Sequence, residues 1–380
     1  MIKSFTASTR EIDDSAAAIA EIKAAFEGKL LKNSLGLISY FSEFEETGVL
    51  KAVCDALPFD CIGSTSCLCS AGKQTDQIIL TITVLTSDDC SFETIVLPIT
   101  EKYDESINSA LSPVINRSGE KPALILSYFP LMNTVSGDMI LAAIDKVTGG
   151  IPLFGTTSID HNMNFSAAKT MRNGEAFRES AVLGLLYGDF NYSFGVASID
   201  KSKIRSQKAV ITESDGNILI GVNDKSVVEY LEEIGLSTTE LANGLAILPL
   251  VVDHKDGTKH VARAVFTLTP EGHAVCGGAM PVGATLAIGR IVPEDVLNTT
   301  EESLKPLVDK DSVVLSYSCM ARYHALGTDY AAEAKKVSEL AGDMRYMFAC
   351  SGGEICPLPD ASGKLKNFYH NYTNVFCRLS

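Results

Sequence analysis

The sequence predicts a mixed α/β protein, built from repeated strand–helix–strand–strand modules that form mixed sheets in two domains around a shared cleft. Three segments of the chain repeat one pattern: an apolar strand ending in Ser-Tyr, an amphipathic helix, a short strand that enters a turn of small residues, and a returning strand. The stretch between the second and third copies is instead rich in hairpin signals. A chain of 380 residues is also long for a single core, which favours two domains.

Each copy begins with a buried strand, because its apolar run is short and continuous. The helix that follows has apolar residues at helical spacing, as in Ile140, Ala143, Ile144 and Val147 of the second copy. A strand–helix–strand order implies a right-handed crossover and parallel pairing of the first two strands. The three copies comprise residues 35–41, 45–57, 59–72 and 77–85; residues 122–130, 136–147, 151–162 and 179–188; and residues 311–319, 329–341, 345–357 and 374–380.

The remaining elements have terminal signals of their own. An N-terminal helix begins after Asp13 or Asp14, either of which can cap it. A hairpin within 206–224 turns at Asp215-Gly216, and a second hairpin within 261–280 turns at residues 270–272. A short helix over 226–235 ends at its final glycine, and a strand follows within 280–290. The change from strand–helix modules to hairpins places a domain boundary near residue 221, giving domains 1–221 and 222–380.

Composition narrows the classes of function. The chain has 32 Lys and Arg against 47 Asp and Glu, a net charge of −15. This charge disfavours nucleic acids and anionic membrane surfaces as partners. There is no signal-peptide pattern and no apolar run of membrane-spanning length, so we expect a cytoplasmic protein. In that reducing compartment the ten cysteines are expected to be small buried apolar residues rather than disulfides, and they lack zinc-finger spacing.

Three small-residue turns follow equivalent strands, namely "GSTS" at 63–66, "GTTS" at 155–158 and "CSGGE" at 350–354. Ligands of open α/β sheets lie at the carboxyl ends of strands, where exposed hydroxyl and N–H groups can hold polar atoms. Tight turns also need small residues, which is the alternative for each turn alone. The turns supply part of a predicted ligand site: Ser64, Thr65, Thr156, Thr157, Gly353 and Glu354.

The last part of the chain supplies further candidates. Arg322 directly follows a strand, where a buried guanidinium needs a carboxylate from a ligand or from the protein. Glu354 is one such mate for Arg322, or an acceptor for a ligand ammonium beside glycines that permit close approach. "YHNYTN" at 369–374 adds groups that can bind a ligand or the local turn: His370, Asn371 and Thr373.

Enzymatic chemistry has weaker support. Cys319 with His324, or Cys350 alone, is a candidate thiol nucleophile, although burial is the more common role of such a cysteine. His370 together with Cys350, Cys356 and His324 could be imagined as a metal site, but their spacing matches no known fingerprint, so no metal site is predicted. Phosphate-loop, metalloprotease and serine-hydrolase signatures are all missing. We therefore expect a binding protein rather than an enzyme.

Several segments together resemble the FIST proteins, whose domains are named for F-box and intracellular signal transduction. The resemblance covers essentially the whole chain, and its first part would be FIST N-terminal-like and its second part FIST C-terminal-like. One segment departs from the family pattern: the residues before Gly-Glu are usually aromatic in the family, whereas this chain has "FACSGGE" there. The segments that carry it are "GSTS" at 63–66, "ITESDGNILIGVND" at 211–224, "GGAMPVGATLAIG" at 277–289, "YSCMARYHALG" at 317–327, "SGGEICP" at 351–357 and "YHNYT" at 369–373.

The resemblance implies an intracellular sensory domain that binds a small polar metabolite such as an amino acid, without a cofactor, and signals through a separate protein. Arg322 would then hold the carboxylate of the ligand and Glu354 its ammonium. Some stand-alone relatives are similar to haem proteins that sense nitric oxide and act on a partner histidine kinase. That alternative needs an axial ligand such as His161, His273 or a cysteine. A cysteine-dependent enzyme is the third hypothesis.

Overall fold

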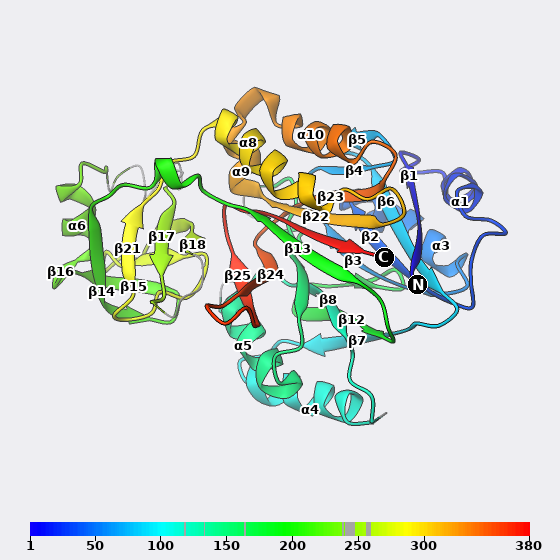
Figure 1. Cartoon of the computed structure of the whole chain (residues 1–380), viewed down its shortest axis with the longest axis horizontal. Coiled ribbons are helices and arrows are strands. Elements are labelled where there is room, and N and C mark those ends of the chain that lie inside the picture. The colour runs from blue at the N-terminus through cyan, green and yellow to red at the C-terminus, as the bar shows by residue number, and fades with distance from the viewer. Residues whose placement is uncertain (118, 133, 163–164, 238, 240–247, 256–259) are drawn as a thin grey trace.

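The computed structural model describes residues 1–380 except 118, 133, 163–164, 238, 240–247 and 256–259. In the described residues, three six-stranded sheets form the body of the molecule, and an eight-stranded sheet forms a lobe at one end (Figure 1). This confirms the predicted mixed α/β class with repeated modules and mixed sheets. None of the helices in the described ranges has the length and apolar character that a membrane span requires.

The first sheet has the order β1-β6-β2-β3-β10-β11. β2 and β3 are parallel, as the crossover predicts, and β6 is antiparallel to β2. The predicted helix 45–57 is divided in two, because Gly48 adopts a left-handed φ of 82° between its parts. The strands are β1 (Lys3–Thr9), β6 (Leu80–Ser87), β2 (Asn33–Tyr40), β3 (Asp60–Thr65), β10 (Thr170–Arg172) and β11 (Glu175–Phe177). The helices are α1 (Ser15–Ala24), which Asp14 caps, α2 (Glu43–Glu46) and α3 (Val49–Asp55).

The second sheet has the order β25-β24-β9-β8-β12-β7, again with a parallel pair, β8 and β9, at its centre. Its crossover helix α5 presents its apolar stripe to the sheet and ends at Gly149, which has a left-handed φ of 73°. The strands are β25 (Leu365–His370), β24 (Glu354–Pro359), β9 (Leu153–Thr157), β8 (Leu124–Phe129), β12 (Ser180–Tyr187) and β7 (Ser91–Pro98). The helices are α4 (Tyr103–Ile115) and α5 (Gly137–Thr148).

The third sheet has the order β13-β26-β22-β23-β4-β5, with β22 and β23 parallel. The strands are β13 (Tyr192–Ala197), β26 (Asn374–Leu379), β22 (Val313–Cys319), β23 (Arg345–Ser351), β4 (Cys69–Ala71) and β5 (Gln74–Asp76). Its helical elements are α8 (Pro293–Leu304), η2 (Lys305–Leu307), α9 (Met320–Ala325), η3 (Gly327–Asp329) and α10 (Ala332–Ala341).

The three body sheets exchange hairpins in a cycle. The hairpin β4–β5 belongs to the first module but joins the third sheet, where β4 pairs with β23. In the same way, the hairpin β10–β11 of the second module joins the first sheet, and the hairpin β24–β25 of the third module joins the second sheet. Each parallel pair therefore carries a hairpin from another module on the side of its second strand. This exchange ties segments that are far apart in sequence into one body with approximate threefold repetition.

The strand register shows that the Ser-Tyr pair of the first copy is not equivalent to the Ser-Tyr pairs of the other two copies. The last residue of the first turn, Ser66, donates its main-chain N–H to Tyr40 O. The last residue of the second turn, Ser158, donates in the same way to Phe129 O. Tyr40 therefore corresponds to Phe129, and Ser39 occupies the position of Tyr128. The landmark is shifted by one residue in the first copy, and such a shift turns a side chain to the other face of a sheet. Tyr128 and Tyr317 share their position, and their hydroxyls lie 2.9 Å apart inside the body.

The lobe is an antiparallel sheet with the order β18-β17-β21-β14-β15-β20-β19, and β16 pairs with β15. Gly216 makes the predicted turn between β14 and β15 with a φ of 56°. The predicted boundary near residue 221 falls inside β15, and the division into 1–221 and 222–380 stays a prediction. The strands are β18 (Val261–Arg263), β17 (Leu250–Asp253), β21 (Thr285–Ile288), β14 (Lys208–Asp215), β15 (Ile218–Val222), β20 (Ala274–Cys276), β19 (Val265–Leu268) and β16 (Lys225–Ser226). The helical elements are α6 (Val227–Glu233) and, before the lobe, η1 (Lys201–Lys203).

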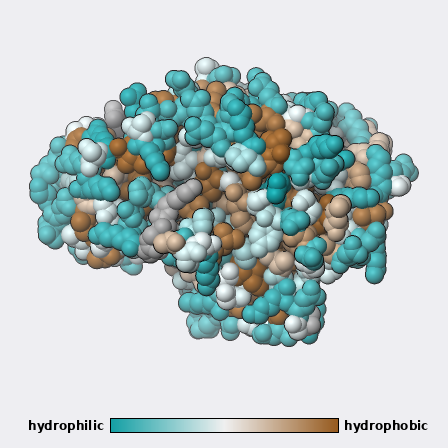
Figure 2. All heavy atoms as spheres, in the orientation of Figure 1, coloured by the Kyte–Doolittle hydropathy of each residue, from teal (hydrophilic) through white to brown (hydrophobic). Residues whose placement is uncertain are grey.

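The apolar cores lie between the sheets and their helices. One core joins residues of all three body sheets, including Leu37, Leu126 and Leu315. The lobe has its own core, which also takes Leu358 and Phe368 from the hairpin β24–β25. That hairpin therefore packs against both the body and the lobe. Figure 2 shows a largely polar surface on one face of the molecule, with apolar residues gathered mainly towards the middle.

Candidate functional site

The three predicted turns meet inside the body, as the sequence predicted for equivalent strand ends. Main-chain and side-chain hydrogen bonds join them in a cycle, in which each turn contacts the next. The three bonds run from Ile159 N to Thr65 O (3.3 Å), from Gly352 N to Thr157 O (3.0 Å) and from Ser66 Oγ to Cys350 O (3.0 Å). The meeting point is filled by buried polar side chains that bind one another.

The first turn is occupied by the chain itself. Thr65 Oγ1 accepts a hydrogen bond from Lys169 N at 2.9 Å and donates to Lys169 O at 3.3 Å. Ser64 is buried in the sheet, opposite Ser39 on β2 and Thr170 on β10. Ser64 and Thr65 thus belong to the meeting point, but none of these contacts joins them to Glu354.

The second and third turns bind each other directly. Thr156 Oγ1 donates to Ser351 Oγ at 2.7 Å, and Thr157 Oγ1 lies 3.0 Å from the hydroxyl of Tyr369. Gly353 is required at its position, because a Cβ there would lie 2.0 Å from the Tyr369 hydroxyl oxygen. The backbone of the third turn therefore approaches a tyrosine ring more closely than any side chain would permit.

Glu354 is the one predicted site residue with a free atom. It is fully buried, its Oε2 accepts a hydrogen bond from Thr373 Oγ1 at 2.7 Å, and its Oε1 has no partner among the described residues. Ser351 is close by, but its single proton goes to Gly353 O, and its oxygen accepts from Thr156 and from Gly353 N. Burial raises the pKa of Glu354 well above its ordinary value and so favours the neutral form of the carboxyl.

Arg322 has a different partner from the one the sequence suggested. It binds Glu333 on α10, with Nε 3.0 Å and Nη2 2.8 Å from Oε1. Val296 O and the hydroxyl of Thr300 complete its shell at 2.8 and 2.9 Å. Burial opposes ionisation of Glu333, but the charge and hydrogen bonds of Arg322 outweigh it and hold the pKa of Glu333 below its ordinary value. Arg322 is therefore committed to the fold and is not free to hold a ligand carboxylate.

His370 and Asn371 lie on the side of the network that faces the lobe. The Nε2 atom of His370 lies 2.9 Å from Cys356 O, and burial lowers the pKa of His370 to about 4, so the ring is neutral. Asn371 Oδ1 accepts from Ala264 N of the lobe at 3.2 Å. Asn371 thus joins the lobe to the body, whereas the His370 ring contacts β24 within the body, and neither bond involves the Glu354 carboxyl.

The sequence interpretation missed several partners. Glu333 is the buried acid of a helix whose other charged residues are exposed or half-buried, a pattern that amphipathic spacing alone could have flagged. Tyr369 directly precedes the predicted His370, yet nothing local shows that its ring crosses to Gly353. Arg263 of the lobe is also buried, 3.4 Å from Asp138 and 2.7 Å from Tyr369 O. That contact depends on long-range packing and has no local signal.

The cysteines and histidines that the sequence suggested for thiol catalysis or haem binding are poorly placed for those roles. Burial raises the pKa of Cys319 well above its ordinary value, and the neighbouring Cys67 thiol, together with burial, does the same for Cys350. Both are thus protonated thiols and poor nucleophiles. His161 packs against Phe41 with ring centroids 4.5 Å apart and the rings tilted by 35°, and His273 lies in the lobe beside the turn after β19. Within the described ranges, no group of three or more His, Cys, Asp or Glu residues could hold a metal ion.

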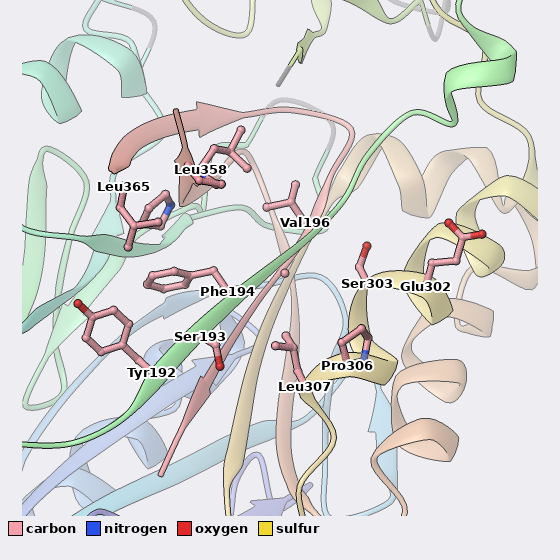
Figure 3. Close-up of a pocket in the computed structure, with 13 residues that line it drawn as sticks. Tyr192, Ser193, Phe194, Val196, Glu302, Ser303, Pro306, Leu307, Leu358 and Leu365 are labelled. Carbon is pink, nitrogen blue, oxygen red and sulfur yellow. The ribbon is translucent and has the colours of Figure 1, made fainter. Parts of the chain in front are cut away.

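Two of the surface grooves formed by the described residues include no predicted site residue. The larger, of about 540 Å³, follows β13 between α8–η2 and the hairpin β24–β25 (Figure 3). The other, of about 450 Å³, lies where Arg205 N donates to Ile288 O and Arg290 N donates to Lys203 O. Neither groove is lined by a histidine or a cysteine. The network around Glu354 and the groove along β13 are thus two separate features.

Comparisons with known proteins match the chain to two domain families. The FIST N domain matches residues 34–225, and the FIST C domain matches residues 227–357. No curated protein matches the chain. A crystal structure of cyanuric acid hydrolase from A. caulinodans aligns with 100% of this chain and 98% of its own, at 9% identity and a TM-score of 0.39. At that level the likeness carries no argument about function.

Proposed function

The chain belongs to the FIST family, whose domains are sensory domains of signal transduction, and we propose that it senses a small polar metabolite through the carboxyl group of Glu354. The observation that carries the proposal is the unpartnered Oε1 atom of this fully buried side chain. Buried polar atoms are nearly always hydrogen-bonded, and an orphaned one costs about 1–3 kcal/mol. A ligand that donates a hydrogen bond to Oε1 removes this cost.

The chemistry of the site favours an amine. A neutral amine can accept the proton of the neutral carboxyl or donate a hydrogen bond to Oε1, and an ammonium group beside it favours loss of the carboxyl proton. An amino acid would place its amino group here, as the resemblance to the family implies. Its carboxylate would need other donors, because Arg322 already binds Glu333. We therefore assign recognition to the amine end of the ligand.

Access to Glu354 runs through the third turn. Gly352 is part-exposed, whereas Ser351 and Gly353 on either side are buried. The turn binds the second module through Gly352 N and Gly353 O and approaches the Tyr369 ring. A ligand that enters at Gly352 thus shifts contacts between modules, which gives binding a route to a change that a separate partner protein can read.

The test is a thermal-shift screen of wild type and Glu354→Gln at pH 7, using methylammonium and the common amino acids as probes. Glutamine keeps the size of the side chain but cannot ionise. We expect at least one amine to raise the Tm of wild type, and to raise that of the variant much less. The proposal fails if no probe stabilises wild type, or if Glu354→Gln responds equally. A parallel titration with haem, followed by its Soret band, tests the gas-sensor alternative.

A further inference from the structure

The groove along β13 has a sheet edge as its floor. β13 is the terminal strand of the third sheet and pairs with β26 on one side only. Asn191 and Ser380 exchange both of their main-chain hydrogen bonds, which fixes the alternation along the pair. The N–H and C=O groups of Tyr192, Phe194 and Val196 therefore point away from β26, towards the free edge.

The walls of the groove carry several apolar side chains beside polar groups. In Figure 3, Leu358 and Leu365 of the hairpin β24–β25 lie on one side of β13, whereas Pro306 and Leu307 lie on the other. Edge strands are usually protected by lysine, proline or a bulge, but "YSFGVA" has none of these. The volume of about 540 Å³ is sufficient for a short extended segment.

The charge of the groove restricts its occupant. Glu302 is the one charged residue in the lining, and it forms no ion pair or side-chain hydrogen bond within the described residues. Glu302 projects from α8 at the outer margin of the groove, beyond Ser303 as seen from β13 (Figure 3), in a protein with a net charge of −15. A segment that brings a lysine or arginine to this margin gains an opposite charge, whereas an acidic segment is repelled.

A second copy of the chain fits poorly. Its β13 edge would be recessed between the same two walls, so two such edges cannot approach to the roughly 4.8 Å at which strands pair. Pairing would also bring together two copies of Glu302. A flexible segment of another protein has neither obstacle.

We propose that the groove binds an extended segment of a partner protein, which adds a strand to β13 and carries alternating apolar residues and a basic residue towards Glu302. The main-chain groups of Tyr192, Phe194 and Val196 hold the backbone of the segment, and the walls select its side chains. This goes beyond ligand sensing, since it assigns a docking surface for an output partner. The groove shares no lining residue with the Glu354 network, so the two proposals can fail separately.

The test uses a display library of random octapeptides, selected on wild type and then measured by fluorescence polarisation. We expect the selected peptides to alternate apolar residues and to include Lys or Arg. Glu302→Lys, a change at an exposed side chain, should weaken a selected peptide at least tenfold and favour its Lys-to-Glu counterpart. Val196→Pro removes an outward N–H that the fold does not use, and should weaken both peptides at least tenfold.

Three outcomes overturn the proposal. The first is that selection yields no peptide that binds wild type. The second is that selected peptides bind both variants as they bind wild type. The third is that light scattering shows a wild-type dimer and a Val196→Pro monomer, in which case a second copy occupies the groove. The Tm of each variant, with Glu302→Lys expected to match wild type, separates loss of docking from loss of folding.

Discussion

Glu354 and His370 lie directly opposite each other in the register of β24 and β25, and burial raises the pKa of Glu354 and lowers that of His370 to about 4, which favours the uncharged form of each side chain. They do not form an ion pair. Glu354 binds Thr373, whereas His370 contacts Cys356 O. The acid and the base therefore respond to pH in opposite directions, and each can be tested alone.

His370 predicts a loss of stability in acid. Its pKa is about 4 in the folded protein, against about 6.5 when unfolded, so the unfolded chain takes up the proton first as pH falls. Stability from this residue is complete above pH 6.5 and is lost down to pH 4, by about 3 kcal/mol. His370→Gln, which keeps an N–H donor, should lose less stability between pH 7 and pH 4.5 in Tm measurements. Equal losses would show that His370 titrates normally.

Arg322 predicts a large effect of breaking a buried ion pair. Arg322→Met leaves the carboxylate of Glu333 buried without its cation, which should cost about 3–5 kcal/mol and lower the Tm markedly. Replacing both partners, as Arg322→Met with Glu333→Met, should cost less than the sum of the single changes. Lys305→Met, in the exposed pair with Glu301, is the matched control and should change the Tm little. If Arg322→Met matches that control, the pair is not structural.

The hydroxyl pair between Tyr128 and Tyr317 predicts strong coupling. Tyr128→Phe leaves the buried hydroxyl of Tyr317 without this partner, which should cost about 1–3 kcal/mol. The double change to Phe should cost clearly less than the two single changes together. Tyr103→Phe, at a part-exposed position on α4, serves as the control. Strict additivity in Tm would mean that the two hydroxyls do not interact.

The cysteines predict slow alkylation of the native protein. All ten are free and buried, and both candidate nucleophiles have raised pKa values. Mild iodoacetamide followed by peptide mapping should therefore label neither Cys319 nor Cys350 faster than free cysteine. Both should label after denaturation. Rapid labelling of either thiol in the native state would contradict this prediction and support the hypothesis of a cysteine-dependent enzyme.

The sequence allowed much of the fold to be predicted, because its strands and helices carry strong local patterns. The parallel pair in each module follows from the strand–helix–strand order. The hairpin exchange could not be predicted, since β4 and β10 have only three residues each and the longer β24 carries no local signal for its partner sheet. The offset of Ser39 against Tyr128 was also hidden, because a one-residue shift leaves the apolar pattern almost unchanged.

The candidate site was predicted only as a set of neighbours. The turns follow equivalent strands of the repeat, which favoured a common location for them, but whether their side chains bind a ligand or each other depends on packing. Arg322 illustrates this, since Glu333 and Glu354 are both plausible mates along the chain. Only the three-dimensional arrangement decides that Glu333 takes the guanidinium and leaves Glu354 with an unpartnered oxygen.

The most direct test of the account is the protonation state of Glu354, because its neutral and half-satisfied carboxyl carries the proposed function. Infrared difference spectra at pH 7 can compare wild type with Glu354→Gln, with Asp145→Asn as a control at another carboxyl whose pKa burial raises. The account predicts a protonated-carboxyl band in wild type that Glu354→Gln removes and Asp145→Asn leaves in place. If Glu354→Gln leaves that spectral region unchanged, Glu354 is ionised, and the account is contradicted.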